Sequence, residues 1–298
     1  MLKHLRAWRE RGWTVIDAQA YAQAWQRYGG SVATHPLVLE CLAQLSEIPV
    51  RYLGWQADGE VKAAVPTWGR HLALSKEVLK RQGKKGLFDL GNAEIILPAA
   101  ADAGAPLRHA ARYLSELNHG RFEGIEQQAE KLALARPSHD LSKKFRYNQR
   151  RELRLLEEAG GVVRPIGDFS ASDIAAMYCD LFQRRWGFAA TGAAHLVEVL
   201  EGLRGLLVGS VLFLDGAPIA IQLLYRVESP EWISIEYVNG GVDPETKAFS
   251  PGSVLSFLNT QAAWEDANAR GKALRFSFGR ADREYKERWC HPVPVYRS

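Results

Sequence analysis

Three apolar segments in the second half of the chain, followed at once by a long helical pattern, constrain the fold most strongly. Residues 206–214 and 218–227 flank Asp215-Gly216, a pair typical of the two-residue turn in a β-hairpin. A polar Glu-Ser-Pro-Glu sequence then separates the second segment from residues 232–241. This spacing predicts three antiparallel strands, each lying beside the next.

Residues 249–271 follow the third strand and have the pattern of a helix with marked ends. Ser250 suits the N-cap, Pro251 the first helical position and Gly271 the end. The first N–H groups of such a helix point outward, where phosphates are commonly held, and Gly252 would let a phosphate approach closely. The start of this helix is therefore either a simple cap or a donor-binding site formed by Ser250, Gly252, Ser253 and Val254.

The rest of the chain predicts an α/β protein with a similar pattern in both halves. In the first half, a strand pair flanks Asp58-Gly59, and a strand over residues 92–99 and a helix over 106–117 follow. In the second half, the helix is followed by a strand, a short helix and an edge strand, over residues 273–279, 280–289 and 293–297. Two strand–Asp-Gly–strand units suggest duplication of one fold, with domains over residues 1–137 and 138–298.

Composition describes a globular protein with enough apolar surface for a core. The chain has 298 residues, of which 47% are hydrophobic and 24% are charged. Its net charge of +4 is too small to imply nucleic-acid binding by itself. Because no apolar run approaches the length of a membrane-spanning helix and no secretory signal is seen, a cytoplasmic location is expected.

Two local patterns refine this expectation. Cys41, Cys179 and Cys290 are far apart without CxxC spacing, and the histidines are scattered, so neither disulfides nor a metal site are predicted. The first thirteen residues alternate basic residues with Leu and Trp. This segment fits either a first helix with a solvated basic face or a peripheral contact with anionic lipid headgroups.

A strongly basic helix is predicted over residues 138–159, where Ser138 suits the N-cap and Gly160-Gly161 the end. Such a helix attracts phosphates or other acidic partners in a salt-dependent way. The alternative is a solvated face that nearby Glu residues partly neutralise. The six cations in question are Lys143, Lys144, Arg146, Arg150, Arg151 and Arg154.

Candidate catalytic residues are few, because GxSxG, HExxH and Walker-loop motifs are missing from the sequence. On the short helix, Tyr285 could protonate a leaving group and Lys286 could stabilise an oxyanion. On the third strand, Glu236 could take a proton from an incoming amine. Each also has a plain structural explanation: Lys286 as the i+4 partner of Asp282, Tyr285 as part of an aromatic anchor with Trp289, and Glu236 as an exposed strand residue.

Four segments occur in the order seen in GNAT-like acyltransferases of the Fem and CelD types. They are LSKKFRYNQRRELRLLEEAGG, VLFLDGAPIAIQLLY, SPGSVL and FSFGRADREYKERW. Tyr285 and Lys286 match the final Tyr-Lys element of those families, whereas Ser277 stands where an Asp is often found. At full length, including the ending ERWCHPVPVYR, the chain resembles the macrophage-inducible (Mig-type) bacterial family.

The resemblance implies tandem GNAT-like domains, each a mixed, mostly antiparallel sheet flanked by helices. It further implies an acyl- or aminoacyltransferase that modifies an amine or hydroxyl of an envelope glycan or lipid. The Mig-type family is associated with resistance to cationic antimicrobial peptides and with the inner membrane. A rival interpretation is a non-catalytic protein of the same fold that binds anionic lipid, glycan or peptide.

Two donors are compatible with this resemblance, and neither requires a metal. Acyl-CoA would use the helix start at residues 250–254 together with Arg280, whereas aminoacyl-tRNA would use the basic helix as a phosphate-tracking surface. With either donor, Glu236 would take the proton of the acceptor, Lys286 would hold negative charge, and Tyr285 would assist the leaving group.

Overall fold

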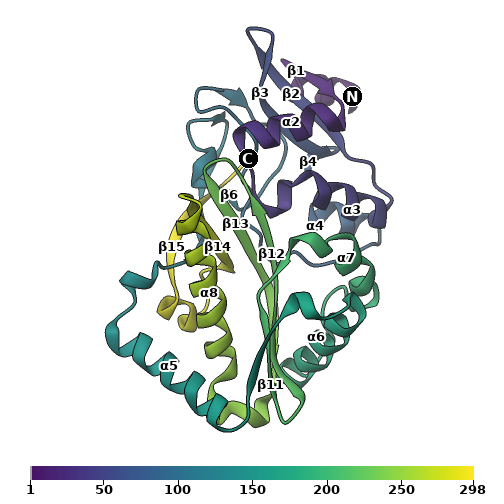
Figure 1. Cartoon of the computed structure of the whole chain (residues 1–298). Coiled ribbons are helices and arrows are strands. Elements are labelled where there is room, and N and C mark those ends of the chain that lie inside the picture. The colour runs from purple at the N-terminus through teal and green to yellow at the C-terminus, as the bar shows by residue number, and fades with distance from the viewer. Residues whose placement is uncertain (1) are drawn as a thin grey trace.

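The computed structural model describes residues 2–298, apart from the side chains of residues 2–5 and 285. It shows a mixed α/β fold with mostly antiparallel sheets, which confirms the predicted fold class (Figure 1). The helices are α1 (Leu2–Arg9), α2 (Ala18–Tyr28), α3 (Pro36–Ser46), α4 (Lys76–Arg81), α5 (Lys143–Glu158), α6 (Ala171–Trp186), α7 (Leu196–Gly202) and α8 (Pro251–Ala269). The strands are β1 (Trp13–Ile16), β2 (Arg51–Ala57), β3 (Glu60–Trp68), β4 (His71–Leu72), β5 (Ala105–Pro106), β6 (Leu114–Ser115), β7 (Phe122–Glu123), β8 (Glu126–Ala135), β9 (Val162–Pro165), β10 (Leu207–Val208), β11 (Ser210–Leu214), β12 (Ala217–Glu228), β13 (Trp232–Val242), β14 (Ala273–Arg280) and β15 (Cys290–Arg297).

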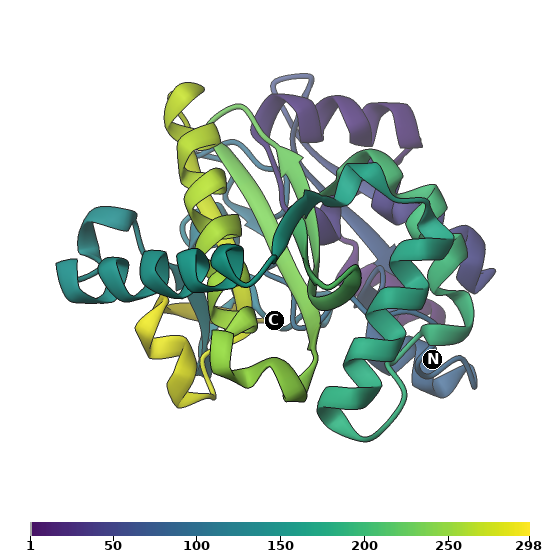
Figure 2. The ribbon, with the colours of Figure 1, turned by 60° about the horizontal axis from the view of Figure 1, so that its bottom comes forward.

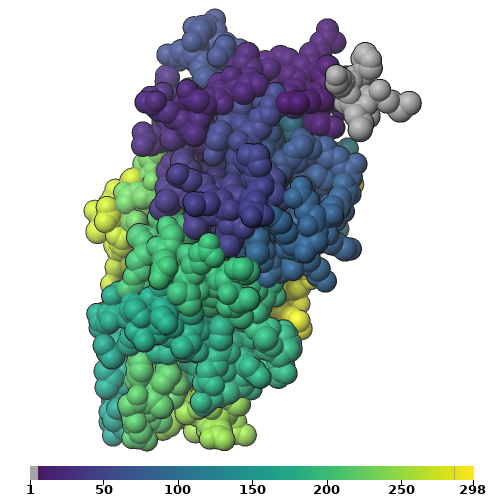
Figure 3. All heavy atoms as spheres, turned by 90° about the vertical axis from the view of Figure 1, so that its right-hand side faces the viewer, coloured from purple at the N-terminus to yellow at the C-terminus, as the bar shows by residue number. Residues whose placement is uncertain are grey.

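One large sheet joins the two halves of the chain. Its strand order is β6-β15-β8-β14-β13-β12-β11-β9, and β10 also pairs with β12. A separate sheet of order β1-β2-β3-β4 belongs to the N-terminal half, which packs against the C-terminal half in Figure 3. The domain boundary at residue 137 stays a prediction; β8, on its N-terminal side, pairs with both β14 and β15 of the C-terminal side.

The predicted meander is confirmed, since β11, β12 and β13 pair in sequence as antiparallel neighbours. Asp215 and Gly216 have φ values of 51° and 77°, the left-handed conformation that a tight hairpin turn needs. The first predicted strand is interrupted at Gly209, whose φ is 101°, and therefore forms the two strands β10 and β11.

The parallel pair β13 and β14 forms the centre of the sheet, with α8 as the connection between them. Their pairing runs from Trp232 opposite Ala273 to Glu236 opposite Ser277. Beyond that last pair, β13 stays beside β12, whereas β14 continues only beside β8. The two strands therefore separate directly after Glu236 and Ser277.

Helices cover both faces of this sheet. On one face, α6 packs against β12 and β13, where a Cβ on Gly241 would stand only 2.5 Å from the Cβ of Leu181. On the other face, α8 buries Phe257 and Ala267 against Phe276 of β14. Figure 2 shows α5 crossing in front of α8 and projecting beyond the rest of the chain.

In the first half, the hairpin around Asp58-Gly59 is confirmed as β2 and β3. Two other predictions were wrong. Residues 92–99 make only isolated bridges instead of a strand, and residues 106–117 contain short strands instead of a helix. Tyr113 has a φ of 59°, which a helix interior does not allow, while Leu107, after β5, and Leu114, in β6, pack into the core.

Three further features differ from prediction: where one helix starts, the type of another and the position of the last strand in the sheet. The basic helix starts at Lys143, because the hydroxyl of Ser142 accepts the N–H of Phe145 at 3.1 Å; Ser138 lies in a preceding 3-10 turn. The predicted short helix is a 3-10 helix (Glu284–Arg288). The last strand is not an edge, since β15 lies between β6 and β8.

Candidate functional site

An arch of nine residues, 281–289, forms the candidate site at the end of β14. The chain leaves β14 at Arg280, passes over one face of β8 and returns as β15, which pairs with the other edge of β8. A hollow of about 350 Å³ lies between the arch and that face of β8. Its lining residues come from β8, the arch and the start of β15.

The arch places Lys286, predicted to stabilise an oxyanion, close to Arg280, the last residue of β14 and a predicted contact of acyl-CoA. The Nζ of Lys286 donates to the carbonyl oxygens of Phe278 at 2.8 Å and Arg280 at 2.6 Å, and lies 3.6 Å from a carboxylate oxygen of Asp282. Arg280 pairs with the same Asp282 at 2.7 Å. Partial burial lowers the pKa of Lys286 from its ordinary value, although Asp282 opposes this effect.

This bonding confirms that Lys286 and Asp282 are partners. It also fixes the arch, because one ammonium holds two carbonyls of the strand from which the arch begins. Tyr285 belongs to the same 3-10 helix, but its side chain lies outside the part of the chain that the structure describes. The catalytic roles of Lys286 and Tyr285 stay predictions.

Glu236 is buried rather than an exposed strand residue, with only 1% of its surface accessible. One carboxylate oxygen accepts the N–H of Glu94 at 3.1 Å, and the other accepts the hydroxyl of Ser277 at 3.0 Å. Burial raises the pKa of Glu236 well above its ordinary value, and the nearby Glu94 carboxylate adds to the effect. Glu236 is not among the residues that line the hollow. Its role as a base stays a prediction.

Beside Glu236 lies a buried ion pair that the sequence analysis missed. Arg275 of β14 forms a bidentate pair with Glu94, with its Nε 2.9 Å from Oε2, and also contacts Ser115 and Glu116. The signal was available, since Arg275 interrupts the apolar strand Ala-Leu-Arg-Phe-Ser-Phe. Its partner is 181 residues earlier in the chain, however, so no local spacing links them.

The start of α8 does not carry the cap that the sequence predicted. Ser250 has a φ of 49°, and the described structure gives its side chain no capping hydrogen bond. The backbone oxygen of Ser250 instead accepts the N–H groups of Ser253 at 2.9 Å and Val254 at 3.0 Å. A Cβ on Gly252 would lie 3.1 Å from Val242, so this glycine also serves packing. Donor binding by these residues stays a prediction.

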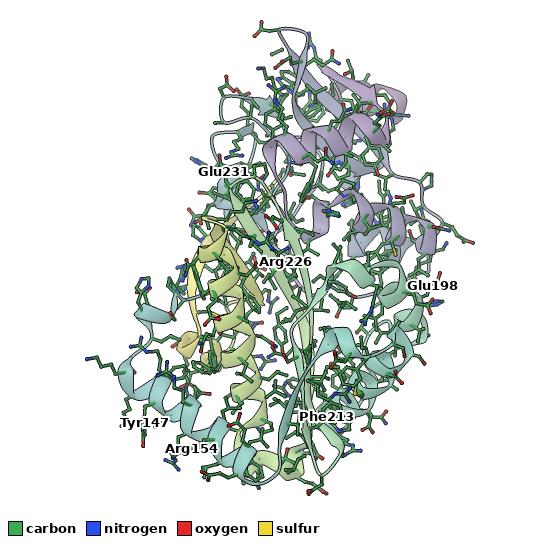
Figure 4. The ribbon with its side chains drawn as sticks, in the orientation of Figure 1. Tyr147, Arg154, Glu198, Phe213, Arg226 and Glu231 are labelled. Atoms are coloured by element: carbon green, nitrogen blue, oxygen red, sulfur yellow. The ribbon has the colours of Figure 1, made fainter. Side chains whose placement is uncertain are left out.

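The basic helix α5 connects this helix start with the arch. Near its N-terminus, Phe145 stacks edge-on against Trp289 of the arch, and near its C-terminus Leu156 packs with Val254 of α8. Tyr147 and Arg154 project outward from it in Figure 4. Of the six predicted cations, Arg146 donates to the carbonyls of residues 138 and 141, and five are exposed: Lys143, Lys144, Arg150, Arg151 and Arg154.

The described part of the chain lacks both side-chain clusters that could hold a metal ion and helices that could cross a membrane. Among residues 2–298, with the side-chain exceptions given above, no cluster of His, Cys, Asp or Glu is arranged to hold a metal ion. Within the same residues, no helix combines the length and apolarity needed to cross a membrane. The predicted basic N-terminal pattern falls partly on residues 1–5, outside the described side chains.

Comparison with known proteins identifies the family. Residues 35–298 match the Mig-14 family. The chain belongs to the Mig-14 family. This confirms the Mig-type resemblance seen in the sequence, and no curated protein sequence matches the chain.

Solved structures show which fold this Mig-14 chain shares. It superposes on the crystal structure of FemX with a TM-score of 0.56 and 11% identity, covering 96% of each chain. L-PGS from Bacillus licheniformis gives a TM-score of 0.47 and 14% identity, over 94% of this chain and 90% of that one. At 11% identity, the likeness to FemX shows a common fold.

Proposed function

We propose that this Mig-14 family protein is a transferase that moves an acyl or aminoacyl group onto an amine or hydroxyl of a cell-envelope component. The observation that carries the proposal is the arch, which gathers Lys286 and Arg280 around a hollow where β14 has left β13. The fold shared with FemX supports it. A transferred amino acid would add positive charge to the envelope and so repel cationic antimicrobial peptides.

In this proposal the arch supplies positive charge to the transfer step. The ammonium of Lys286 stands at the wall of the hollow and uses two of its three N–H groups on the carbonyls of Phe278 and Arg280. Its third N–H would stabilise the oxyanion that forms when an acceptor attacks the donor carbonyl. Tyr285 would protonate the leaving group, and the proton lost by the attacking amine or hydroxyl would pass to solvent water, which returns a proton to Tyr285. Glu236 contributes by holding Ser277 and the backbone of Glu94 in place, because its burial keeps it from the hollow.

The donor is either acyl-CoA at the start of α8, with Arg280, or aminoacyl-tRNA along α5. The structure's charge distribution favours aminoacyl-tRNA. At the start of α8, the N–H groups of Ser253 and Val254 are bonded to the backbone oxygen of Ser250, whereas five cations of α5 are exposed. A protein at the cytoplasmic face of the inner membrane would meet both this donor and an envelope glycan or lipid acceptor.

Label transfer tests the proposal. The purified chain is incubated with an envelope extract and either radiolabelled acyl-CoA or radiolabelled aminoacyl-tRNA, at two salt concentrations. We expect label to enter a glycan or lipid with one donor, and K286M to lower the rate about 100-fold, as removal of an oxyanion-stabilising group does. R288M is the matched control, since Arg288 is an exposed arch residue outside the hollow.

The outcomes separate the alternatives. Strongly salt-dependent transfer from tRNA without transfer from acyl-CoA selects α5 as the donor surface. If neither donor labels the envelope while the folded chain binds envelope lipid, glycan or peptide, the protein is non-catalytic and the proposal fails. An equal loss of activity in K286M and R288M would remove the specific role of Lys286.

A further inference from the structure

We infer that the hollow under the arch binds a phosphate group of the acceptor, held between Lys131 and Arg283. Both side chains line the hollow, one from β8 and the other from the arch. Neither was singled out by the sequence pattern. The inference deepens the proposed function and rests on it in taking the bound phosphate compound to be the acceptor.

Charge pairing distinguishes these two cations from the others around the hollow. Arg280 pairs with Asp282, and Lys286 bonds two carbonyls and lies 3.6 Å from the same Asp282. Among the described side chains, Lys131 and Arg283 have no acidic partner, whereas Glu130 is neutralised by Arg112 at 2.6 Å. The lining also includes the carboxylate of Glu287. Once Glu130 is paired, two carboxylates, Asp282 and Glu287, face four cations, Lys131, Arg280, Arg283 and Lys286. The hollow therefore has a local excess of positive charge that an anion would neutralise.

Backbone hydrogen bonds hold together the two segments that carry these cations. The N–H of Ala281 donates to the carbonyl oxygen of Lys131 at 2.8 Å, which ties the start of the arch to β8. Arg283 follows two residues later, and Lys286 holds the same stretch through the carbonyls of β14. Because the backbone is held on both sides, the chain loses less conformational entropy when an anion binds.

The remaining lining indicates the class of molecule. Ala129, Ala133 and Pro292 provide small apolar surfaces beside the cations. A volume of about 350 Å³ is at the lower end of ordinary ligand pockets, so it suits a headgroup rather than a whole glycolipid. A phosphate ester with a small polar headgroup, either free or on a lipid, fits this combination, since Arg and Lys both bind phosphate well.

Equilibrium binding tests the inference with two probes, sn-glycerol 3-phosphate and vesicles of phosphatidylglycerol in phosphatidylcholine. We expect K131M and R283M each to weaken binding about tenfold, and the double variant to abolish it, because each removes a charge-assisted hydrogen bond. R288M, with the same loss of charge on the same arch, should bind within about twofold of the parent. Circular dichroism confirms that each variant is folded.

The two probes distinguish the sources of phosphate. Binding of glycerol 3-phosphate with the same variant pattern shows a headgroup site, and vesicle binding alone with that pattern shows a site that requires the lipid surface. Equal weakening by R288M, or full binding by the double variant, overturns the inference. If the chain binds phosphate in this pattern but transfers no label, the phosphate site stands and the proposed transferase function fails.

Discussion

Replacing Arg275 by Met should lower the free energy of unfolding by about 3–5 kcal/mol, the range seen when one partner of a buried ion pair is removed. Glu94, with 1% of its side chain exposed, would then keep a buried charge without its cation. Because Arg275 is in β14 and Glu94 is in the N-terminal half, the loss should weaken the contact between the halves. Urea denaturation followed by circular dichroism measures the change.

The companion variants make this prediction specific. R275M combined with E94M should recover most of the lost stability, since the fully buried carboxylate of Glu94 is then no longer left without its cation. Arg283→Met, at an exposed position, should change stability by less than about 0.5 kcal/mol. Equal stability of R275M and R283M would show that the buried pair contributes nothing to the junction.

Replacing Glu236 by Ala should also have a large effect. The change leaves the N–H of Glu94 and the hydroxyl of Ser277 without their acceptor, at about 1–3 kcal/mol for each buried group. E236Q should cost much less, because an amide of the same shape keeps hydrogen-bonding capacity at both positions. Denaturation of both variants at one pH provides the comparison.

The pH dependence of E236Q tests the protonation state of Glu236. The pKa of Glu236 in the folded chain is raised above its ordinary value of 4.5, so the folded state binds this proton more tightly than the unfolded state. That stabilisation is complete below pH 4.5 and is lost as the pH rises through the folded pKa. The parent chain should therefore lose stability relative to E236Q as the pH rises above 4.5 towards the raised pKa of the folded state. A difference in the free energy of unfolding between the parent chain and E236Q that does not change with pH would contradict the raised pKa.

The elements that could be predicted from the sequence are those with strong local signals. Asp58-Gly59 and Asp215-Gly216 marked their hairpins because left-handed turn residues are few. Residues 106–117 misled because Leu and Ala at helical spacing also suit extended chain that packs on a core. The positive φ of Tyr113 excludes a continuous helix over these residues, and no local pattern predicts that conformation for a tyrosine.

In the candidate site, too, the residues within one local segment could be predicted, whereas the pairs that form between distant strands could not. Lys286 and Arg280 were predicted because they lie within one short segment that resembles a known element. The pairs of Arg275 with Glu94, and of Glu236 with Ser277, depend on strands that meet only through sheet topology. Lys131 was missed because its importance comes from the arch above β8, which sequence spacing does not reveal.

Photolabelling tests the central claim, transfer beside the arch, most directly. A photoreactive group replaces the transferred acyl group, on CoA and on tRNA in separate samples, and mass spectrometry locates the attached peptide. The account predicts labelling of the arch at 281–289 or of β8 below it, with competition by unmodified donor. Labelling confined to the sheet of β1–β4, with the arch unmodified under both donors, would contradict it.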